Sequence, residues 1–441
     1  MPFSSILVSP LKRGDIMANK IQAPKGFEDI LPADSWKWQA IERIARETAG
    51  LYHFDEIRTP VLESTALFHR GVGEGSDIVR KETFTFEDRG GDSMTLRPEG
   101  TAGVVRAAIE HNLIAQEGAR AKVFYIGANF RYERPQKGRL RAHHQFGAEA
   151  FGIADPAQDV ECILLQMDFY QRCGLKDVEL QINSLGDAES KQRYRDLLVA
   201  FLTPKKEQLS EDSQRRLAEN PLRILDSKDP RDKQAVEGAP PATEALSQQS
   251  REHFLEVTHL LQLTTDNGPR TNFTVNPNLV RGFDYYTETL WEVTASGLGA
   301  QNAIGGGGRY DNLVENLGGR PTPGVGFGSG LERLLIALEA QGVALADVRQ
   351  PLVWLVYHGD AARAAQWRLL QELRASNIAA DMDHSGRSAK AQYKILTREE
   401  ARYTVTVGDA ELTSGAVVFK DMQTGEQVAL SKEQLVARLR A

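Results

Sequence analysis

The order of strands and helices along the chain changes near residue 350, and this change most constrains the fold. Before it, strand-like runs come in clusters with helices set between them, and after Pro351 strands and helices alternate regularly. Clustered strands favour an α+β domain with a mostly antiparallel sheet and flanking helices, whereas regular alternation favours a small α/β domain. A chain of 441 residues is also too long for one ordinary core.

The first pattern predicts a domain over residues 18–345. Helical spacing appears at 36–52, 101–111, 159–172 and 330–341, and strand-like runs lie at 56–63, 84–86, 94–96, 123–126, 145–151, 272–275 and 289–294. Within this domain, residues 187–266 carry dense mixed charge and several prolines, which predicts a helical insertion. The second pattern predicts an α/β domain over residues 351–441, and residues 1–17 are expected to form a disordered extension.

Composition limits the classes of protein. A hydrophobic content of 41% with 26% charged residues is typical of a globular protein, and no apolar stretch approaches the roughly 20 residues of a membrane span. The net charge of -7 means that a polyanionic partner must be met by local basic patches. Two cysteines that form no metal-ligand spacing and the lack of a signal-peptide cleavage pattern predict a cytoplasmic protein without a membrane partner.

Common phosphate-binding motifs are missing from the sequence, including the P-loop pattern and the dinucleotide fingerprint. If ATP binds, arginines must therefore contact much of the triphosphate. The sequence offers such arginines in three separated segments.

The first segment runs from Phe130 to Arg141 and is strongly basic. Arg131 and Glu133 are two residues apart, which places them on one face of a predicted strand. The basic loop that follows, with Arg134, Lys137 and Arg139, suits contact with a phosphate backbone. A solvated hairpin tip is the alternative, because charge runs are usually only exposed.

The second segment is a predicted strand with alternate glycines that opens a helix at Gly330. The apolar stripe of this helix leaves Arg333 on another side, where its guanidinium could meet a terminal phosphate, or where it is an ordinary surface arginine. The third segment holds Arg281, Tyr285 and Tyr286, followed by the glycine run 305–308 and Tyr310. Adjacent tyrosines on a strand point to opposite faces, so one is expected in the core, and the glycine run is interpreted as a tight turn.

Together these segments resemble class II aminoacyl-tRNA synthetases. Thr59-Pro60 is similar to motif 1, Arg131 with Glu133 to motif 2, and the run from Gly326 to Arg333 to motif 3. Within that class, four longer segments in the right order resemble the histidyl-tRNA synthetase family: LRPEGTA from Leu96, RYERPQKGR from Arg131, LVRGFDYYT from Leu279 and GGGRYDNL from Gly306.

The resemblance implies a class II catalytic domain, with a helical insertion and a C-terminal α/β anticodon-binding domain. It implies a ligase that activates L-histidine with ATP and Mg²⁺, releases pyrophosphate and transfers the histidyl group to the 3′ end of tRNA(His). By the same resemblance, Arg131, Arg281 and Arg333 are the expected catalytic residues, with Arg131, Glu133 and Arg333 on ATP. The loop residues Arg134, Lys137 and Arg139 are expected to contact tRNA. The expected assembly is a homodimer whose interface includes motif 1.

The histidine-binding residues implied by the resemblance fall into two groups. Glu99, Thr101 and Gln145 match the ligands of the substrate ammonium group. Glu149 and Tyr286 match the pair that reads the imidazole, and Tyr285 and Tyr310 belong to the same pocket. The alternative is a catalytically silent relative, such as the synthetase-like, histidine-sensing regulatory subunit of ATP phosphoribosyltransferase, which lacks the C-terminal domain and loses motif residues.

Overall fold

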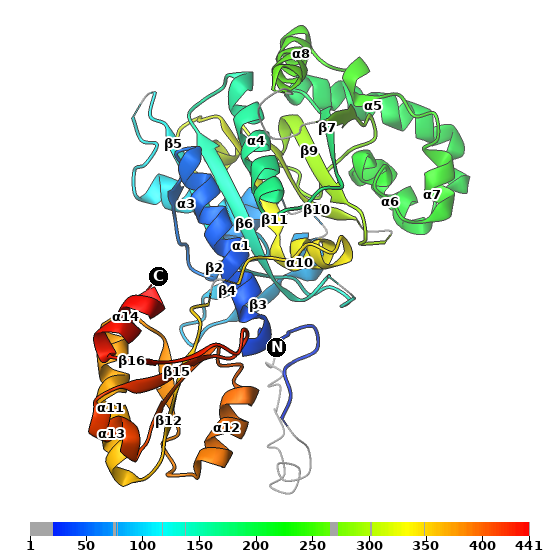
Figure 1. The fold of residues 1–441 in the computed structure, drawn as a ribbon. Helices are drawn as coiled ribbons and strands as arrows, with labels where there is room; N and C mark the ends of the chain where they lie inside the picture. Colours follow the sequence, from blue (N-terminus) through cyan, green and yellow to red (C-terminus); the bar gives the residue numbers. More distant parts are fainter. Residues whose placement is uncertain are drawn as a thin grey trace, which may run out of the picture. The chain divides into compact units, whose positions relative to one another are not determined.

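The structure is a computed structural model that describes residues 21–73, 76, 78–116, 118–136, 138–264, 272–299, 302–347 and 349–440. The expected extension over residues 1–17 lies outside this part of the chain. The chain divides into two compact units, residues 1–346 and 347–441 (Figure 1). No helix among the described residues is long and apolar enough to cross a membrane.

An eight-stranded sheet forms the centre of the first unit, in the order β1-β5-β6-β11-β10-β9-β7-β8. Only the pairs β1 with β5 and β7 with β8 are parallel, so the sheet is mostly antiparallel and the expected α+β class is confirmed. The strands are β1 (Asp55–Glu56), β5 (Ala121–Phe130), β6 (Ala142–Phe151), β7 (Val178–Ser184), β8 (Phe273–Val275), β9 (Thr287–Ala295), β10 (Ala303–Arg309) and β11 (Gly324–Gly330).

Helix α4 (Pro156–Arg172) packs across one face of this sheet (Figure 1). The helix begins where Asp155 caps it by accepting a hydrogen bond from the Ala157 amide, with Pro156 at its first position. Helix α4 also contacts α1 (Pro32–Leu51) and α8 (Gln248–Leu263). These helices bury the main hydrophobic core of the unit against the sheet.

Strand alternation separates the helix-covered face of the sheet from the opposite face. In β6, Phe146 packs against Phe169 of α4, with ring centroids 4.8 Å apart, and Ala148 lies in the same core. The neighbouring side chains Gln145 and Glu149 therefore point to the other face. That face carries the candidate site.

A small sheet in the order β2-β4-β3 lies beside the main one. The single strand predicted over residues 56–63 is wrong, because the chain forms two short strands on either side of Thr59-Pro60, and proline has no N–H to donate to a strand ladder. The elements here are β2 (Leu62–Ser64), α2 (Thr65–Val72), a π-helix (Ile78–Glu82), β3 (Phe84–Glu87), β4 (Ser93–Leu96) and α3 (Thr101–Glu110).

The segment between β7 and β8 forms a helical insertion, which has one small hydrophobic cluster of its own and shares a second cluster with Leu279 and Leu290. Its helices are α5 (Ala188–Leu202), α6 (Glu211–Glu219), α7 (Pro230–Ala235) and α8, joined by 3-10 turns at Thr203–Gln208, Pro221–Ile224 and Ala242–Glu244. After β10 follow α9 (Leu313–Asn316) and, beyond β11, α10 (Leu331–Ala340).

The second unit is a five-stranded sheet in the order β13-β12-β14-β15-β16 with helices alternating between strands. Its elements are β12 (Val353–Tyr357), α11 (Asp360–Ala375), β13 (Ala380–Met382), α12 (Ala389–Arg398), β14 (Tyr403–Val407), α13 (Asp409–Ser414), β15 (Val417–Asp421), β16 (Gln427–Leu430) and α14 (Lys432–Arg440). A capping box begins the last helix, since Ser431 and Gln434 each donate a backbone amide hydrogen bond to the other's side chain.

Candidate active site

A cavity of about 470 Å³ opens on the sheet face that the helices leave free. Its walls come from β6, β10, β11, the loop after β5, the segment before β9 and the start of α10. Eleven of the predicted site residues line it: Glu99, Thr101, Arg131, Glu133, Arg139, Gln145, Arg281, Tyr285, Tyr286, Tyr310 and Arg333. The three arginines from separate segments thus meet at one cavity.

Arg131 enters the cavity from the end of β5. The prediction that Arg131 and Glu133 share one strand face is wrong, because β5 ends at Phe130 and both residues lie in the loop. The Nε of Arg131 donates to the Pro98 carbonyl at 2.8 Å, and its guanidinium carbon lies 5.7 Å from the Phe283 ring centroid. Burial lowers the pKa of Arg131, which shows that its charge is held in a poorly solvated place.

The basic loop divides between the cavity and its outside. Arg139 turns inward and forms an ion pair with Glu133, so both line the cavity. Arg134 is exposed, which is compatible with a tRNA contact and with a solvated hairpin tip. Lys137 lies outside the described residues.

Arg281 reaches the cavity from the segment that precedes β9. Its Nη1 donates to Glu292 at 2.7 Å, and its buried Nε has no hydrogen-bond partner among the described residues. Burial alone would lower the pKa of Arg281, but the nearby Tyr286 and Glu292 raise it. A buried, charged donor that still has bonding capacity is suited to an anionic ligand.

The glycine run 305–308 is strand β10, so its interpretation as a tight turn is wrong. Glycines are required here because side chains from other segments pack against the backbone of the strand so closely that a Cβ atom would clash with them. A Cβ at Gly306 would lie 2.9 Å from the Nη1 of Arg281 and 2.5 Å from the Trp291 carbonyl oxygen. Glycine therefore makes room for the guanidinium group of Arg281.

Arg333 lies in the first turn of α10. Leu331, Leu334 and Leu338 bury the other side of this helix, which leaves Arg333 half-buried at the cavity wall. Burial lowers the pKa of Arg333, and the positive charge of Arg139 lowers it further. Two guanidinium groups that repel each other are stabilised when a polyanion lies near both.

Glu149 lies just beneath the cavity floor and does not itself line the cavity. It is fully buried and accepts hydrogen bonds from Tyr310 and, at 2.7 Å, from Thr101. Burial raises the pKa of Glu149 to about 8, although both hydrogen bonds act to lower it, and Glu99 raises it. Gly326 leaves the space that this carboxyl group occupies, since any Cβ there would clash with it.

Glu99 and Gln145 each already accept hydrogen bonds from other groups of the protein. Glu99 accepts from the amides of Thr101 at 2.6 Å and Ala102 at 3.0 Å, and so caps the start of α3. Gln145 accepts from Asn129 at 2.6 Å. Burial raises the pKa of Glu99, while the α3 amides and Arg131 lower it. Each carboxylate oxygen has a second lone pair, so Glu99 retains bonding capacity toward the cavity.

Tyr285 and Tyr286 both line the cavity and both belong to one buried cluster, so the expected split into one pocket tyrosine and one core tyrosine is wrong. The expectation assumed a strand, but β9 begins only at Thr287, so the alternation rule does not apply to the pair. Tyr285 packs against Phe283 in a parallel stack at 5.1 Å and meets Tyr310 edge-on at 5.7 Å. The three tyrosines and Thr101 enclose a polar and aromatic cup beside the arginines.

Several lining residues were missed at the sequence level. His143 shares a face of β6 with Gln145, and the period of two could have revealed it. Its pKa is lowered to about 3 by burial and by Arg131, so it is neutral near pH 7. Tyr125 and Glu292 gave no local signal, and Asp226 and Lys228 come from the insertion.

A mostly antiparallel sheet, arginines from motifs 2 and 3 in one cavity, and an adjoining polar cup define a class II aminoacyl-tRNA synthetase. The histidyl-tRNA synthetase family model matches residues 26–334, and an anticodon binding domain model matches residues 352–441. The chain belongs to the histidyl-tRNA synthetase family.

Similar proteins agree with this assignment. A histidine–tRNA ligase of Streptococcus uberis is 47% identical over 420 residues, covering 95% of this chain and 97% of the relative. A histidine–tRNA ligase of Halothermothrix orenii is 47% identical over 419 residues, covering 95% and 99%. The apo structure of the S. aureus histidyl-tRNA synthetase matches with a TM-score of 0.79 and 37% identity, covering 96% of this chain and all (100%) of that one.

The fold alone does not separate the ligase from its regulatory relatives. A Bacillus halodurans structure described as an ATP phosphoribosyltransferase regulatory subunit/histidyl-tRNA synthetase has a TM-score of 0.62 at 22% identity, covering 88% of this chain and 98% of that one. The ligases match at about twice this identity over nearly the whole chain. The regulatory alternative is therefore less supported.

Proposed function

We propose that the cavity of the first unit is the place where this chain activates histidine. The chain is a histidine–tRNA ligase, which uses ATP to form histidyl-adenylate, releases pyrophosphate and transfers the histidyl group to tRNA. The observation that carries the assignment is that Arg131, Arg281 and Arg333 line one cavity beside the polar cup.

In the first step the histidine carboxylate attacks the α-phosphate of ATP, and the bond to the pyrophosphate group breaks. Negative charge grows on the α-phosphate oxygens, and Arg131 and Arg281 are the proposed groups that stabilise it. Both guanidinium groups are already oriented, by the Pro98 carbonyl and by Glu292 respectively. Preorganised donors of this kind contribute roughly 3–4 kcal/mol each to transition-state stabilisation. Arg333 is the proposed ligand of the γ-phosphate.

Mg²⁺ is the proposed metal ion for this reaction. Among the described residues no group of three or more His, Cys, Asp or Glu side chains is arranged to hold a metal. The ion would therefore take most of its ligands from phosphate oxygens and water, as Mg²⁺ commonly does. Glu133 and Glu292 line the cavity and are the candidate protein ligands. When bound, Mg²⁺ neutralises charge on the departing pyrophosphate.

The imidazole ring is proposed to bind in the cup formed by Tyr285, Tyr286 and Tyr310. Glu149 lies directly behind the Tyr310 hydroxyl, so a small displacement of that hydroxyl would let the imidazole N–H donate to Glu149. An apolar side chain in this place would leave a buried carboxyl group and phenols unpaired. Such a mismatch gives roughly 10⁴-fold rejection in other synthetases.

Glu99, Thr101 and Gln145 are the proposed ligands of the histidine ammonium group. All three line the cavity, and each is oriented by a hydrogen bond to a neighbouring group. The Thr101 hydroxyl donates a hydrogen bond to Glu149, so its lone pairs are available to accept from the ammonium group. An orientation fixed before binding lowers the entropic cost of holding the substrate.

Transfer to tRNA involves surfaces on both units. Arg134 and Lys137 are the proposed contacts to the tRNA backbone, and the second unit is the proposed reader of the anticodon. The proposed assembly is a homodimer through the motif 1 region, where Val61 is 45% exposed and β1 forms an edge of the main sheet. The proposed location is the cytoplasm.

A charging assay tests the proposed function. Purified protein is incubated with ATP, Mg²⁺, labelled histidine and a tRNA fraction, and acid-precipitable label is counted. We expect labelled tRNA that depends on ATP and is lost with Arg281→His. Histidine binding without any charging would favour the regulatory alternative instead.

A further inference from the structure

The segment from residue 280 to residue 286 carries Arg281 and both cup tyrosines, yet it belongs to no strand or helix. Among the described residues, its only regular backbone feature is a turn at Asp284 and Tyr285, so few backbone–backbone hydrogen bonds hold it. A segment of this kind keeps a single conformation only if side chains hold it. Three of its carbonyl oxygens, those of Gly282, Asp284 and Tyr286, accept hydrogen bonds from side chains.

Two of the donors come from the helical insertion, and the Ser76 hydroxyl also donates to the Gly282 carbonyl at 3.5 Å. Lys191 of α5 donates its Nζ to the Asp284 carbonyl at 3.1 Å and to the Tyr286 carbonyl at 2.8 Å. Arg223, from the 3-10 turn after α6, donates to the Gly282 carbonyl and lies 3.7 Å from the Asp284 carboxylate. Asn220 donates to the same carboxylate at 3.1 Å.

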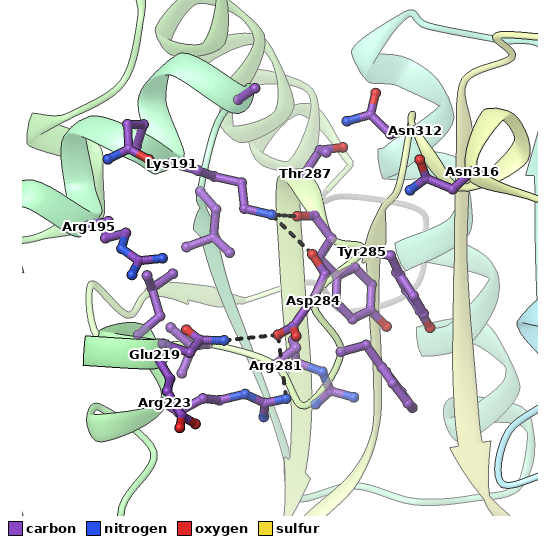
Figure 2. A pocket seen from close by; sticks show the side chains of 18 residues that line it. Lys191, Arg195, Glu219, Arg223, Arg281, Asp284, Tyr285, Thr287, Asn312 and Asn316 are labelled. Atoms are coloured by element: carbon purple, nitrogen blue, oxygen red, sulfur yellow. Dashed lines mark hydrogen bonds and ion pairs between the residues drawn. The ribbon is translucent and has the colours of Figure 1, made fainter. Parts of the chain in front are cut away.

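These contacts lie on the side of the segment that faces away from the active-site cavity. Here a second cavity of about 490 Å³ separates the insertion from the segment. Figure 2 shows Lys191 reaching across it to the backbone beside Asp284, with Arg223 below, while Arg281 and Tyr285 belong to the segment itself. The segment is therefore a thin wall between two cavities, held from behind by two cations.

We propose that Lys191 and Arg223 are positioning residues for histidine activation, which hold the wall formed by residues 280–286 so that Arg281 and the tyrosine cup face the active site. The proposal rests on the function proposed for the cavity. It makes the insertion part of the amino-acid site, because a shift of α5 moves the carbonyl of Tyr286 directly. Burial lowers the pKa of Lys191, while Asp284 raises it.

Lys191 holds the wall in place because carbonyl groups that lose their hydrogen-bond donor cost free energy. Replacing Lys191 by methionine removes one charged donor from two carbonyls and fills a similar volume with an apolar chain. The two carbonyls would then turn toward water in the second cavity, which rotates the peptides that carry Tyr285 and Tyr286. The positions of the Tyr285 and Tyr286 rings in the cup would therefore change. The hydrophobic clusters of the first unit would stay intact, because no residue of these clusters is replaced.

The test compares Lys191→Met with the matched variant Arg195→Met. Arg195 lies one turn along the same helix and lines the same cavity, but its bond goes to the Ala218 carbonyl within the insertion. We expect Lys191→Met to raise the histidine KM in pyrophosphate exchange roughly tenfold or more, on the scale of a lost charged hydrogen bond. The ATP KM should change less than about twofold, and Lys191→Arg should recover part of the loss. Arg195→Met should behave as the unsubstituted protein.

Hydrogen exchange provides a readout that does not depend on activity. In the ligand-free protein, amides of residues 281–287 should exchange faster in Lys191→Met than in Arg195→Met, with β9 unchanged. Asn220→Ala removes only the bond to Asp284 and serves if Lys191→Met folds poorly, with a smaller increase in exchange.

Equal exchange of this segment in Lys191→Met and the unsubstituted protein would overturn the proposal. Loss of thermal stability with an unchanged histidine KM would also overturn it, since the role would then be structural only. An unsubstituted protein that shows no histidine-dependent exchange would instead refute the proposed function, and the hydrogen exchange result would still decide the role of Lys191.

Discussion

At the scale of single residues, the site depends on charged groups held in poorly solvated positions. Arg281 has a buried Nε without a protein partner among the described residues, and Glu149 is fully buried behind Tyr310. Buried ionisable groups whose pKa is shifted by burial and by specific neighbours are typical of catalytic sites. Each of these two residues gives a prediction.

Arg281→His should fold and bind histidine but lose adenylate formation. We expect pyrophosphate exchange to fall roughly 10²- to 10³-fold, because a preorganised donor to the developing phosphate charge is removed. Histidine affinity, measured by calorimetry without ATP, should change by less than about fivefold. Exchange at the unsubstituted rate would show that Arg281 does not contact the reacting phosphate.

Histidine binding should strengthen as pH rises toward 8.5. Burial raises the pKa of Glu149 to about 8, so near pH 7 most of this carboxyl group is protonated, and it then accepts the imidazole N–H hydrogen bond more weakly than a carboxylate does. The histidine KM should therefore fall roughly fivefold to tenfold between about pH 7 and pH 8.5, since each pH unit below the pKa reduces the ionised fraction nearly tenfold. Glu149→Gln should bind weakly and without this pH dependence.

The raised pKa of Glu149 also makes the stability of the folded protein depend on pH. A carboxyl group whose pKa is higher in the folded than in the unfolded protein stabilises the fold fully below the unfolded pKa. This contribution is lost as pH rises through the folded value of about 8. The melting temperature of the ligand-free protein should thus decrease from pH 7 to pH 9, and the decrease should be smaller in Glu149→Gln.

At the scale of elements, sequence patterns predicted most helices and strands, including the glycine-containing β11, but not β10. Helices α1, α3, α4 and α10 were predicted because their apolar residues recur at helical spacing. Strand β10 was missed because four adjacent glycines carry no apolar alternation and are usual in turns. Its glycines are explained only by tertiary contacts, with Arg281 and Tyr286 lying on the strand.

The glycine at position 306 gives a prediction for β10. Gly306→Ala should reduce pyrophosphate exchange by about tenfold or more, because the added methyl group would displace the guanidinium of Arg281. It should also lower the free energy of unfolding by about 1–3 kcal/mol, as in other overpacked cores. Gly50→Ala in α1, where nothing lies within 4 Å of the added methyl group, is the control and should retain activity.

The residues of the site were predictable to different degrees. Arg131, Arg281 and Arg333 were recognisable from motif resemblance, yet only the fold brings segments so distant in sequence to one cavity. The two tyrosines were misjudged because the strand rule was applied to a segment that is not a strand. The holding contacts of Lys191 and Arg223 could not be predicted, since neither residue has a distinctive sequence neighbourhood.

At the scale of the whole molecule, the chain consists of two compact units. The first unit carries the cavity and the insertion, and the second is an α/β domain matched by an anticodon binding domain model. The sequence indicated this division because the pattern of elements changes after Pro351. We propose that the first unit binds the amino acid and ATP, and that the tRNA contacts both units.

Three guanidinium groups and an imidazole-shaped cup are proposed to serve one reaction. Pyrophosphate exchange with each of the amino acids in turn tests this claim most directly, with the same protein, ATP and Mg²⁺ throughout. We predict exchange with histidine and at least about 10⁴-fold less with every apolar amino acid, including leucine and phenylalanine. Exchange supported equally by another amino acid, or by none, would contradict the account.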